Sequence, residues 1–173
     1  MQLPDPFPDE YFEAKGDKPV KIKPYNKRYQ KIAEDYLKKI NKILKPVGFK
    51  AVHKGATALG ISGKGDIEFG VYPTEKQWDN VLVVLINYFK GIVGLNQGFA
   101  QFISKYKGEE VEVICIREGF YANIDNKLFA YLKQHQNIVK RYEKIKNDSA
   151  YSSKEYAKAK DKFFRKIIKQ IPD

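Results

Sequence analysis

Cysteine is almost absent from this chain of 173 residues, since Cys115 is the only one. A single cysteine excludes an intramolecular disulfide and suits a reducing compartment. No apolar run approaches the roughly 18–20 residues that a membrane-spanning helix needs. The first residues lack the basic and apolar regions of a signal peptide. We therefore expect a cytoplasmic protein with no membrane partner.

Acidic residues are outnumbered, 21 against 32 lysines and arginines, which gives a formal net charge of +11. This balance favours anionic partners such as nucleotides or RNA. A surface on which most lysines serve only for solvation would explain the same charge. Hydrophobic residues make up 43% of the chain, so it is not disordered, and its length suits one domain with a real core.

Prolines are concentrated at the start of the chain, where residues 1–20 hold four of the eight, together with five acidic residues. We predict an extended N-terminal arm over residues 1–20 and one folded domain over residues 21–173. No internal repeat is found.

Hydrophobic periodicity predicts both helices and strands in the domain. Helices are expected up to about residue 44, over 78–89, over 126–146 and after a possible capping box at Ser152 and Glu155. Strands are expected at 20–23, 49–53, 66–72, 99–106 and 109–117. The predicted fold class is α+β, with a mixed, mainly antiparallel sheet on which the helices pack.

The stretch from His53 to Glu68 is the main candidate for function. It is expected to form a strand end, a glycine turn at Gly55, a short helix, a second glycine turn and another strand. Gly55 has no Cβ that would keep an anion from the backbone, and the amides that follow could open a helix and bind phosphate. Lys64 either contacts a phosphate or is an ordinary turn lysine. His53 is more simply a structural histidine than a ligand.

Two carboxylates follow this turn. Asp66 and Glu68 are two residues apart, so on a strand they point to the same side with their backbones roughly 7 Å apart. Such a pair can converge on two divalent metal ions about 3.5–4 Å apart. A third carboxylate would complete the site, and Glu112 is preferred to Glu110 because it lies in the middle of its strand. A solvated acidic strand face is the alternative.

The order of these features resembles the GrpB-like family of the polymerase-beta-type nucleotidyltransferase superfamily. The superfamily pattern is Gly-Ser at a helix start, two strand carboxylates separated by one residue, and a third carboxylate on a later strand. The resemblance covers about residues 20–173. Besides Gly55, Asp66, Glu68 and Glu112, it includes Pro24-Tyr25, His53, the run Leu128–Leu132, His135, Tyr142, Lys146, Tyr156, Lys160 and Phe163.

The resemblance implies a nucleotidyltransferase-type sheet and a reaction that moves a nucleoside monophosphate from a triphosphate, such as ATP, to an unknown acceptor: RNA, a protein or a small molecule. It implies Mg²⁺ or Mn²⁺ held by Asp66, Glu68 and Glu112. Gly55, Ala56, Thr57 and Lys64 would then contact the nucleotide.

Two departures from the family pattern keep other functions open. Ala56 stands where the family has serine, and Ala130 stands where an arginine is usual. The lost hydroxyl is worth roughly 1.5–3 kcal/mol if it contacts a charged phosphate, and Thr57 could compensate. The alternative is a catalytically weak or inactive nucleotidyltransferase fold that binds a nucleotide or RNA. A protein-interaction module that uses the arm is a further possibility.

Overall fold

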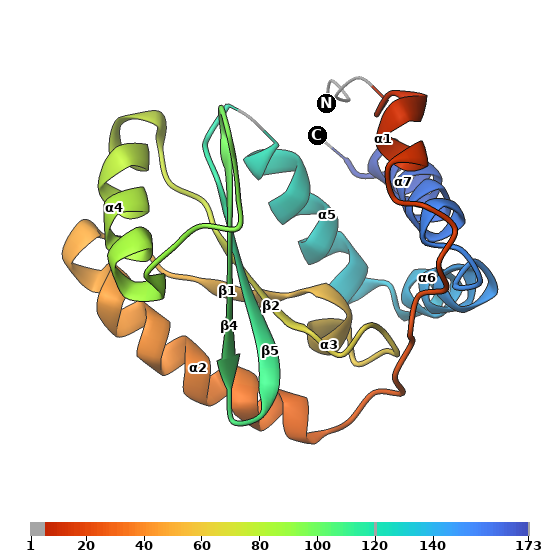
Figure 1. Cartoon of the computed structure of the whole chain (residues 1–173), viewed down its shortest axis with the longest axis horizontal. Coiled ribbons are helices and arrows are strands. Elements are labelled where there is room, and N and C mark those ends of the chain that lie inside the picture. Colours follow the sequence, from red (N-terminus) through yellow and green to blue (C-terminus); the bar gives the residue numbers. More distant parts are fainter. Residues whose placement is uncertain (1–5, 120, 173) are drawn as a thin grey trace.

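The computed structural model describes residues 6–119 and 121–172. Its helices are α1 (Asp9–Glu13), α2 (Arg28–Leu44), α3 (Gly55–Leu59), α4 (Trp78–Phe89), α5 (Ala122–Gln134), α6 (Gln136–Asp148) and α7 (Ser153–Ile168). Its strands are β1 (Val52–Lys54), β2 (Ile67–Val71), β3 (Gly94–Asn96), β4 (Phe99–Tyr106) and β5 (Glu109–Ile116). Two 3₁₀ turns, η1 (Lys45–Val47) and η2 (Glu75–Gln77), follow α2 and precede α4. Figure 1 shows α2 and α4 on one side of the strands and α5 and α7 on the other.

Within these residues the strands form one five-stranded sheet in the order β1-β2-β5-β4-β3. Strands β2 and β5 are parallel, and the other neighbouring pairs are antiparallel. The predicted mixed, mainly antiparallel sheet in an α+β fold is therefore confirmed. Strand β5 pairs with β4 as a local hairpin on one side and with β2, which is distant in sequence, on the other.

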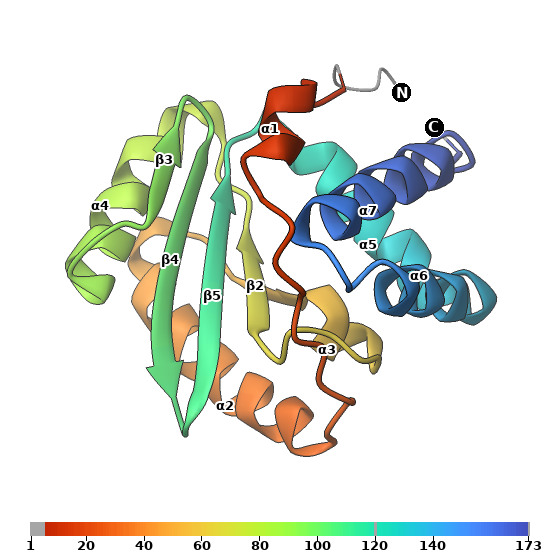
Figure 2. The same ribbon diagram turned by 45° about the vertical axis from the view of Figure 1, so that its right-hand side comes forward.

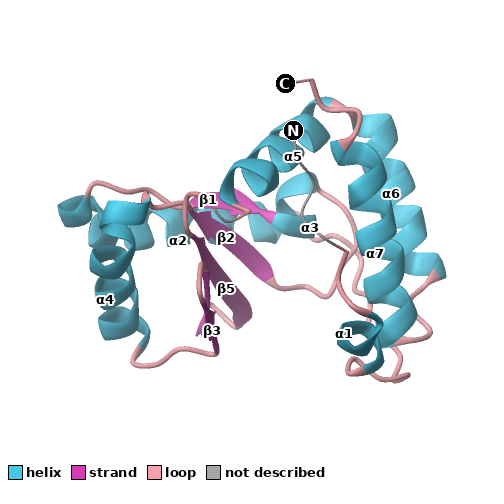
Figure 3. Cartoon of the chain, turned by 90° about the horizontal axis from the view of Figure 1, so that it is seen from above, coloured by secondary structure: helices cyan, strands magenta, loops and turns pink. Residues whose placement is uncertain are grey.

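The two faces of the sheet are covered by different helices (Figures 2 and 3). On one face, Phe69, Val113 and Phe102 share a cross-strand row and pack with the apolar sides of α2 and α4. On the other side, α3, α5, α6 and α7 build a second apolar cluster around residues such as Leu132 and Ile167. The polar face of the sheet therefore looks toward the C-terminal helices, and the candidate site lies there.

The N-terminal arm is not simply extended, as its prolines suggested, because it contains α1. Phe12 of this helix is buried, and Glu13 forms ion pairs with Lys154 and Lys158 of α7. Backbone hydrogen bonds continue the attachment: the Ser153 amide donates to the Lys18 carbonyl at 2.8 Å and the Lys154 amide donates to Gly16 at 2.9 Å. The arm thus lies along the start of α7.

Two other predictions of elements were wrong. Residues 20–23 form no strand but a single bridge between Lys23 and Gly63. The helix expected over 126–146 is two helices that meet at His135, whose backbone is not helical (φ −126°, ψ 75°) and whose Nδ1 lies 2.7 Å from the Tyr131 carbonyl oxygen in a hydrogen bond. The short edge strand β3 was not foreseen. Of the expected capping box, the half from Ser152 is present: its Oγ accepts from the Glu155 amide at 3.3 Å, whereas the Ser152 amide donates to the Ser149 carbonyl.

Among the described residues, no helix has the length and apolar character required to cross a membrane.

Candidate active site

The predicted carboxylates lie on the polar face of the sheet, on neighbouring strands. Glu68 of β2 stands opposite Lys54 of β1 on one side and opposite Glu112 of β5 on the other. Asp66 precedes β2 by one residue and is two residues from Glu68. The strand pairing thus places a lysine and two glutamates in one row across the sheet. Because side chains alternate along a strand, Asp66 points to the same face as Glu68.

Glu68 lies against the glycine turn. A Cβ built on Gly55 would be 1.8 Å from Glu68 Oε2 and 2.6 Å from its Cδ, and Gly55 has a left-handed backbone with φ +74°. Hence the missing Cβ makes room for a carboxylate of the protein itself. Burial, followed by the negative charge of Asp66, raises the pKa of Glu68. Among the described residues, no hydrogen bond to this carboxylate offsets that cost.

Glu112 is half-buried, and its Oε1 accepts a hydrogen bond from Gln101 Nε2 of β4. Burial, and next the charge of Glu68, raises the pKa of Glu112 to about 6. The rival Glu110 is exposed and stands opposite Lys105. Glu112, and not Glu110, is therefore the carboxylate that stands opposite Glu68.

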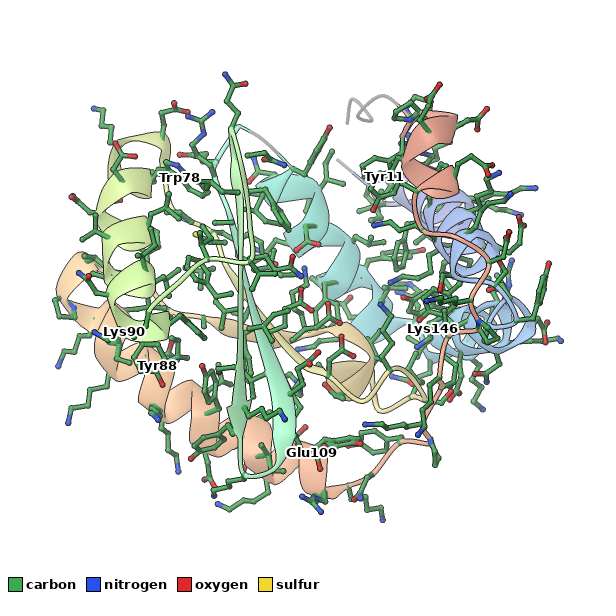
Figure 4. The ribbon with its side chains drawn as sticks, in the orientation of Figure 1. Tyr11, Trp78, Tyr88, Lys90, Glu109 and Lys146 are labelled. Carbon is green, nitrogen blue, oxygen red and sulfur yellow. The ribbon has the colours of Figure 1, made fainter. Side chains whose placement is uncertain are left out.

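The loop between α3 and β2 forms hydrogen bonds with two other parts of the chain, the segment before α2 and helix α6. Lys23 and Gly63 exchange backbone hydrogen bonds of 2.7 and 3.0 Å. On α6, Glu143 Oε1 accepts from the Ser62 amide at 2.7 Å, and Lys146 Nζ donates to the Ser62 carbonyl. Lys146, labelled in Figure 4, is only 1% exposed. Burial, with Lys160 as the second cause, lowers the pKa of Lys146 to about 8. This loop carries Lys64 and leads directly into Asp66.

Asp125 of α5 lies near Glu68 and contacts residues of β1 and of the segment after β2. Asp125 Oδ2 accepts from Lys54 Nζ and from the Tyr72 hydroxyl, both at 2.5 Å. Lys54 is 8% exposed, so this ion pair joins β1 to α5 in a largely buried place. A cavity of about 260 Å³ lies between these groups, lined by Lys54, Gly55, Glu68 and Asp125 as well as by Lys160 of α7.

The residues around Gly55 have their own contacts. Thr57 is 3% exposed, and its Oγ1 shares a hydrogen bond of 2.9 Å with His53 Nε2. Because the Thr57 hydroxyl is engaged with His53, the predicted contact of Thr57 with the nucleotide rests on its backbone amide. Burial, and then Lys133, lowers the pKa of His53 to about 4, in keeping with a structural histidine. The Ala56 Cβ lies 2.7 Å from where a Cβ on Gly63 would be.

The carboxylate set suits a hard divalent cation in its chemistry, since such ions prefer carboxylate oxygens. Glu68 is partly buried, burial raises its pKa, and Asp66 and Glu112 share its face of the sheet. As the side chains stand, no three His, Cys, Asp or Glu residues in the described part of the chain are grouped closely enough to hold a metal ion. That Asp66, Glu68 and Glu112 would hold one stays a prediction.

Comparison with known proteins agrees with this geometry. The profile of the GrpB protein family matches residues 19–170. The chain belongs to the GrpB family. A crystal structure of the conserved protein GrpB from Enterococcus faecalis has a TM-score of 0.70 and 21% identity, and the match covers 87% of this chain and 96% of that one. No curated protein sequence matches the chain.

The GrpB fold is also similar to parts of longer proteins. A structure of the GLD-2/RNP-8 complex has a TM-score of 0.55 and 11% identity, and the match covers 92% of this chain and 62% of that one. A cytoplasmic RNA terminal U-transferase has a TM-score of 0.50 and 14% identity, with coverage of 87% and 49%. The GrpB-family chain thus has a nucleotidyltransferase-type fold, as the sequence resemblance implied.

Several groups of this GrpB-family site were not found from the sequence. Lys54 and Asp125 were missed because a lone strand lysine and a helix aspartate carry no signal until the fold pairs them. Lys146 and Lys160 were noticed only as part of the family pattern. The alternation in β1 was the available clue, since it places Lys54 on the face opposite His53.

Proposed function

We propose that the protein is a metal-dependent nucleotidyltransferase that moves a nucleoside monophosphate from a nucleoside triphosphate to an acceptor hydroxyl. The observation that carries the proposal is the placement of Glu68 and Glu112 at the same level of two parallel strands, with Asp66 beside them and a cavity bordered by lysines. The nucleotidyltransferase-type fold supports it.

The lysines are suited to the triphosphate. Lys54 and Lys160 line the cavity with Glu68. Lys64 enters from the α3–β2 loop, and its charge acts on Glu112, where it opposes the rise in pKa. Gly55, Ala56 and Thr57 offer backbone groups at the mouth of the turn. We assign the phosphates to these groups, because cations and amide donors are what phosphate oxygens bind.

The reaction would form a bond between the acceptor oxygen and the α-phosphorus and break the bond from that phosphorus to the β-phosphate oxygen, which releases pyrophosphate. Mg²⁺ or Mn²⁺ held by Asp66, Glu68 and Glu112 would supply Lewis acidity to the hydroxyl and to the phosphates. The hydroxyl proton leaves to solvent water, because the carboxylates would be engaged in holding the metal ion.

The test is transfer of label from each α-labelled triphosphate, with Mg²⁺ or Mn²⁺, to candidate RNA, protein and small-molecule acceptors. We expect Asp66→Asn and Glu68→Gln to lose at least about 100-fold in rate, as is usual when a main electrostatic contribution is removed. Glu110→Gln is the matched control, because Glu110 is an exposed carboxylate on the same strand as Glu112. The absence of both transfer and metal-dependent nucleotide binding would contradict the proposal.

The second candidate is a fold that binds a nucleotide or RNA without catalysis. It is favoured by Ala56 and by the hydrogen bond that engages Glu112 with Gln101. This alternative predicts binding that survives Asp66→Asn and needs no metal, with a steep salt dependence. Titration of each triphosphate into the parent chain and Asp66→Asn, with and without Mg²⁺, separates the two candidates.

A further inference from the structure

A groove with a volume of about 690 Å³ runs between the N-terminal arm and α7. Phe7 and Tyr11 on the arm, with Tyr156 and Phe164 on α7, line it. The rings of Phe7 and Tyr11 are stacked with centroids 4.3 Å apart, and both side chains are substantially exposed, at 45% and 39%. Figure 4 shows Tyr11 on the side of α1 beside α7. The groove thus presents the exposed part of the Phe7–Tyr11 stack in a concave place, and Lys15 Nζ lies over the Tyr11 ring, 4.4 Å from its centre.

Cations border the same groove. Lys15, Lys21, Lys64 and Lys160 line it, and the last two place Nζ 6.0 and 5.4 Å from the centre of the Tyr156 ring. Among the described residues of its walls, Asp161 is the only acidic one, and it is paired with Arg165 at 2.8 Å. Aromatic faces interleaved with cations are the surface that single-stranded nucleic acids bind, through base stacking and phosphate contacts.

The groove leads to the carboxylates. Lys160 and Phe164 line both the groove and the cavity that holds Glu68, and Lys64 acts on Glu112 from the groove side. We propose that this groove binds the end of a single-stranded nucleic acid, whose bases stack on the aromatic residues and whose terminal hydroxyl is the acceptor. The acceptor role rests on the proposed function, whereas the binding of the strand does not.

The arm gives this chain a feature outside the matched family region, which begins at residue 19. Phe7, Tyr11 and Lys15 all precede that residue, so one wall of the groove is not part of what the family profile describes. The volume is of the size of sites that bind small molecules, roughly 300–1,000 Å³. It therefore suits a few nucleotides better than a folded protein or a duplex.

The experiment measures fluorescence anisotropy of a labelled octamer of uridine with the full chain, without triphosphate and with a chelator. Tyr11→Ala should raise the dissociation constant at least about tenfold, because it removes the Phe7–Tyr11 stack against which a base would pack. Lys21→Ala should reduce the slope of log K against log salt concentration by about 0.7, the value for one phosphate contact of a single strand. Matched controls are Tyr151→Ala, which removes a tyrosine that is 65% exposed outside the groove, and Lys42→Ala on α2.

Unlabelled duplex and uridine monophosphate serve as competitors. Binding that depends on Tyr11 and Lys21, with weaker competition by duplex and by the mononucleotide, supports the proposal. Equal effects of the groove variants and their controls, or equal competition by duplex, overturn it. Because no triphosphate or metal is present, a failure here is independent of whether the transfer assay succeeds. Circular dichroism of each variant checks that α1 and the rest of the fold are retained.

Discussion

At the scale of single residues, Gly55 has a more definite role than its place in a glycine-rich turn suggested. The sequence indicated that a missing Cβ would admit a phosphate. The structure places Glu68 in that space, with Oε2 1.8 Å from the position of a Cβ. Gly55 thus allows a strand carboxylate to lie against the start of α3. A phosphate contact at the backbone of Gly55 stays a prediction.

Gly55→Ala should lower the free energy of unfolding more than Gly60→Ala does. Both glycines are left-handed, with φ +74° and +71°, but a Cβ on Gly60 meets nothing within 4 Å. The shared backbone strain costs roughly 1–2 kcal/mol. The overlap with Glu68 should add about 1 kcal/mol or more to the cost at Gly55, within the range for overpacking. Urea denaturation of the two variants measures the difference.

If the two alanine variants are equally stable, Glu68 moves away at no cost and our account of Gly55 is wrong. Metal-dependent nucleotide binding gives a second comparison, since only Gly55→Ala should weaken it.

At the scale of elements, the parallel pairing of β2 with β5 controls the behaviour of the carboxylates with pH. This pairing puts Glu112 next to Glu68, and burial together with this neighbour gives Glu112 a pKa of about 6. The ordinary value is 4.5, so the folded chain holds the proton more tightly than the unfolded chain does. The unfolding free energy should therefore fall as pH rises through 4.5 to 6, and the loss is complete above that range.

Glu112→Gln should remove this loss. The amide oxygen can still accept from Gln101, but it carries no charge. We expect the variant to be about 1 kcal/mol more stable than the parent chain at pH 7.5, after allowance for solvent screening, and equal to it at pH 4. Urea denaturation with a chelator, at pH 4 and at pH 7.5, measures this. A variant that is less stable at pH 7.5 would contradict the proposed environment of Glu112.

The elements that the sequence predicted well are those with long, regular patterns. Helices α2 and α4, the hairpin of β4 and β5, and α7 with its Ser152 cap all follow from local periodicity. The break at His135 was missed because apolar spacing continues through it, so only packing separates α5 from α6. Strand β3 is too short to show alternation. The carboxylates were found because their spacing is local, whereas the Lys54–Asp125 pair joins residues 71 positions apart.

At the scale of the whole molecule, the site lies between two separately packed parts. One apolar cluster joins α2 and α4 to the sheet, and the other joins α3 to α5, α6 and α7. The chain spanning Ser62, Lys64 and Asp66 is attached to both parts, through β2 and through Glu143 and Lys146. A ligand in the cavity would touch both parts as well, because the cavity is lined from β1, β2, α5 and α7.

A chain that begins at residue 19 tests the division between arm and domain. The truncation removes the buried Phe12, the ion pairs of Glu13 and two backbone hydrogen bonds to the start of α7, but it leaves both apolar clusters complete. We expect it to fold with an unfolding free energy lower by about 2–3 kcal/mol, the value of one buried aromatic side chain and little more. It should still bind triphosphate with metal but lose binding of the uridine octamer. Urea denaturation and the two binding titrations measure these outcomes.

Failure to fold would show that the arm belongs to the domain, and octamer binding that survives truncation would place the nucleic-acid surface elsewhere.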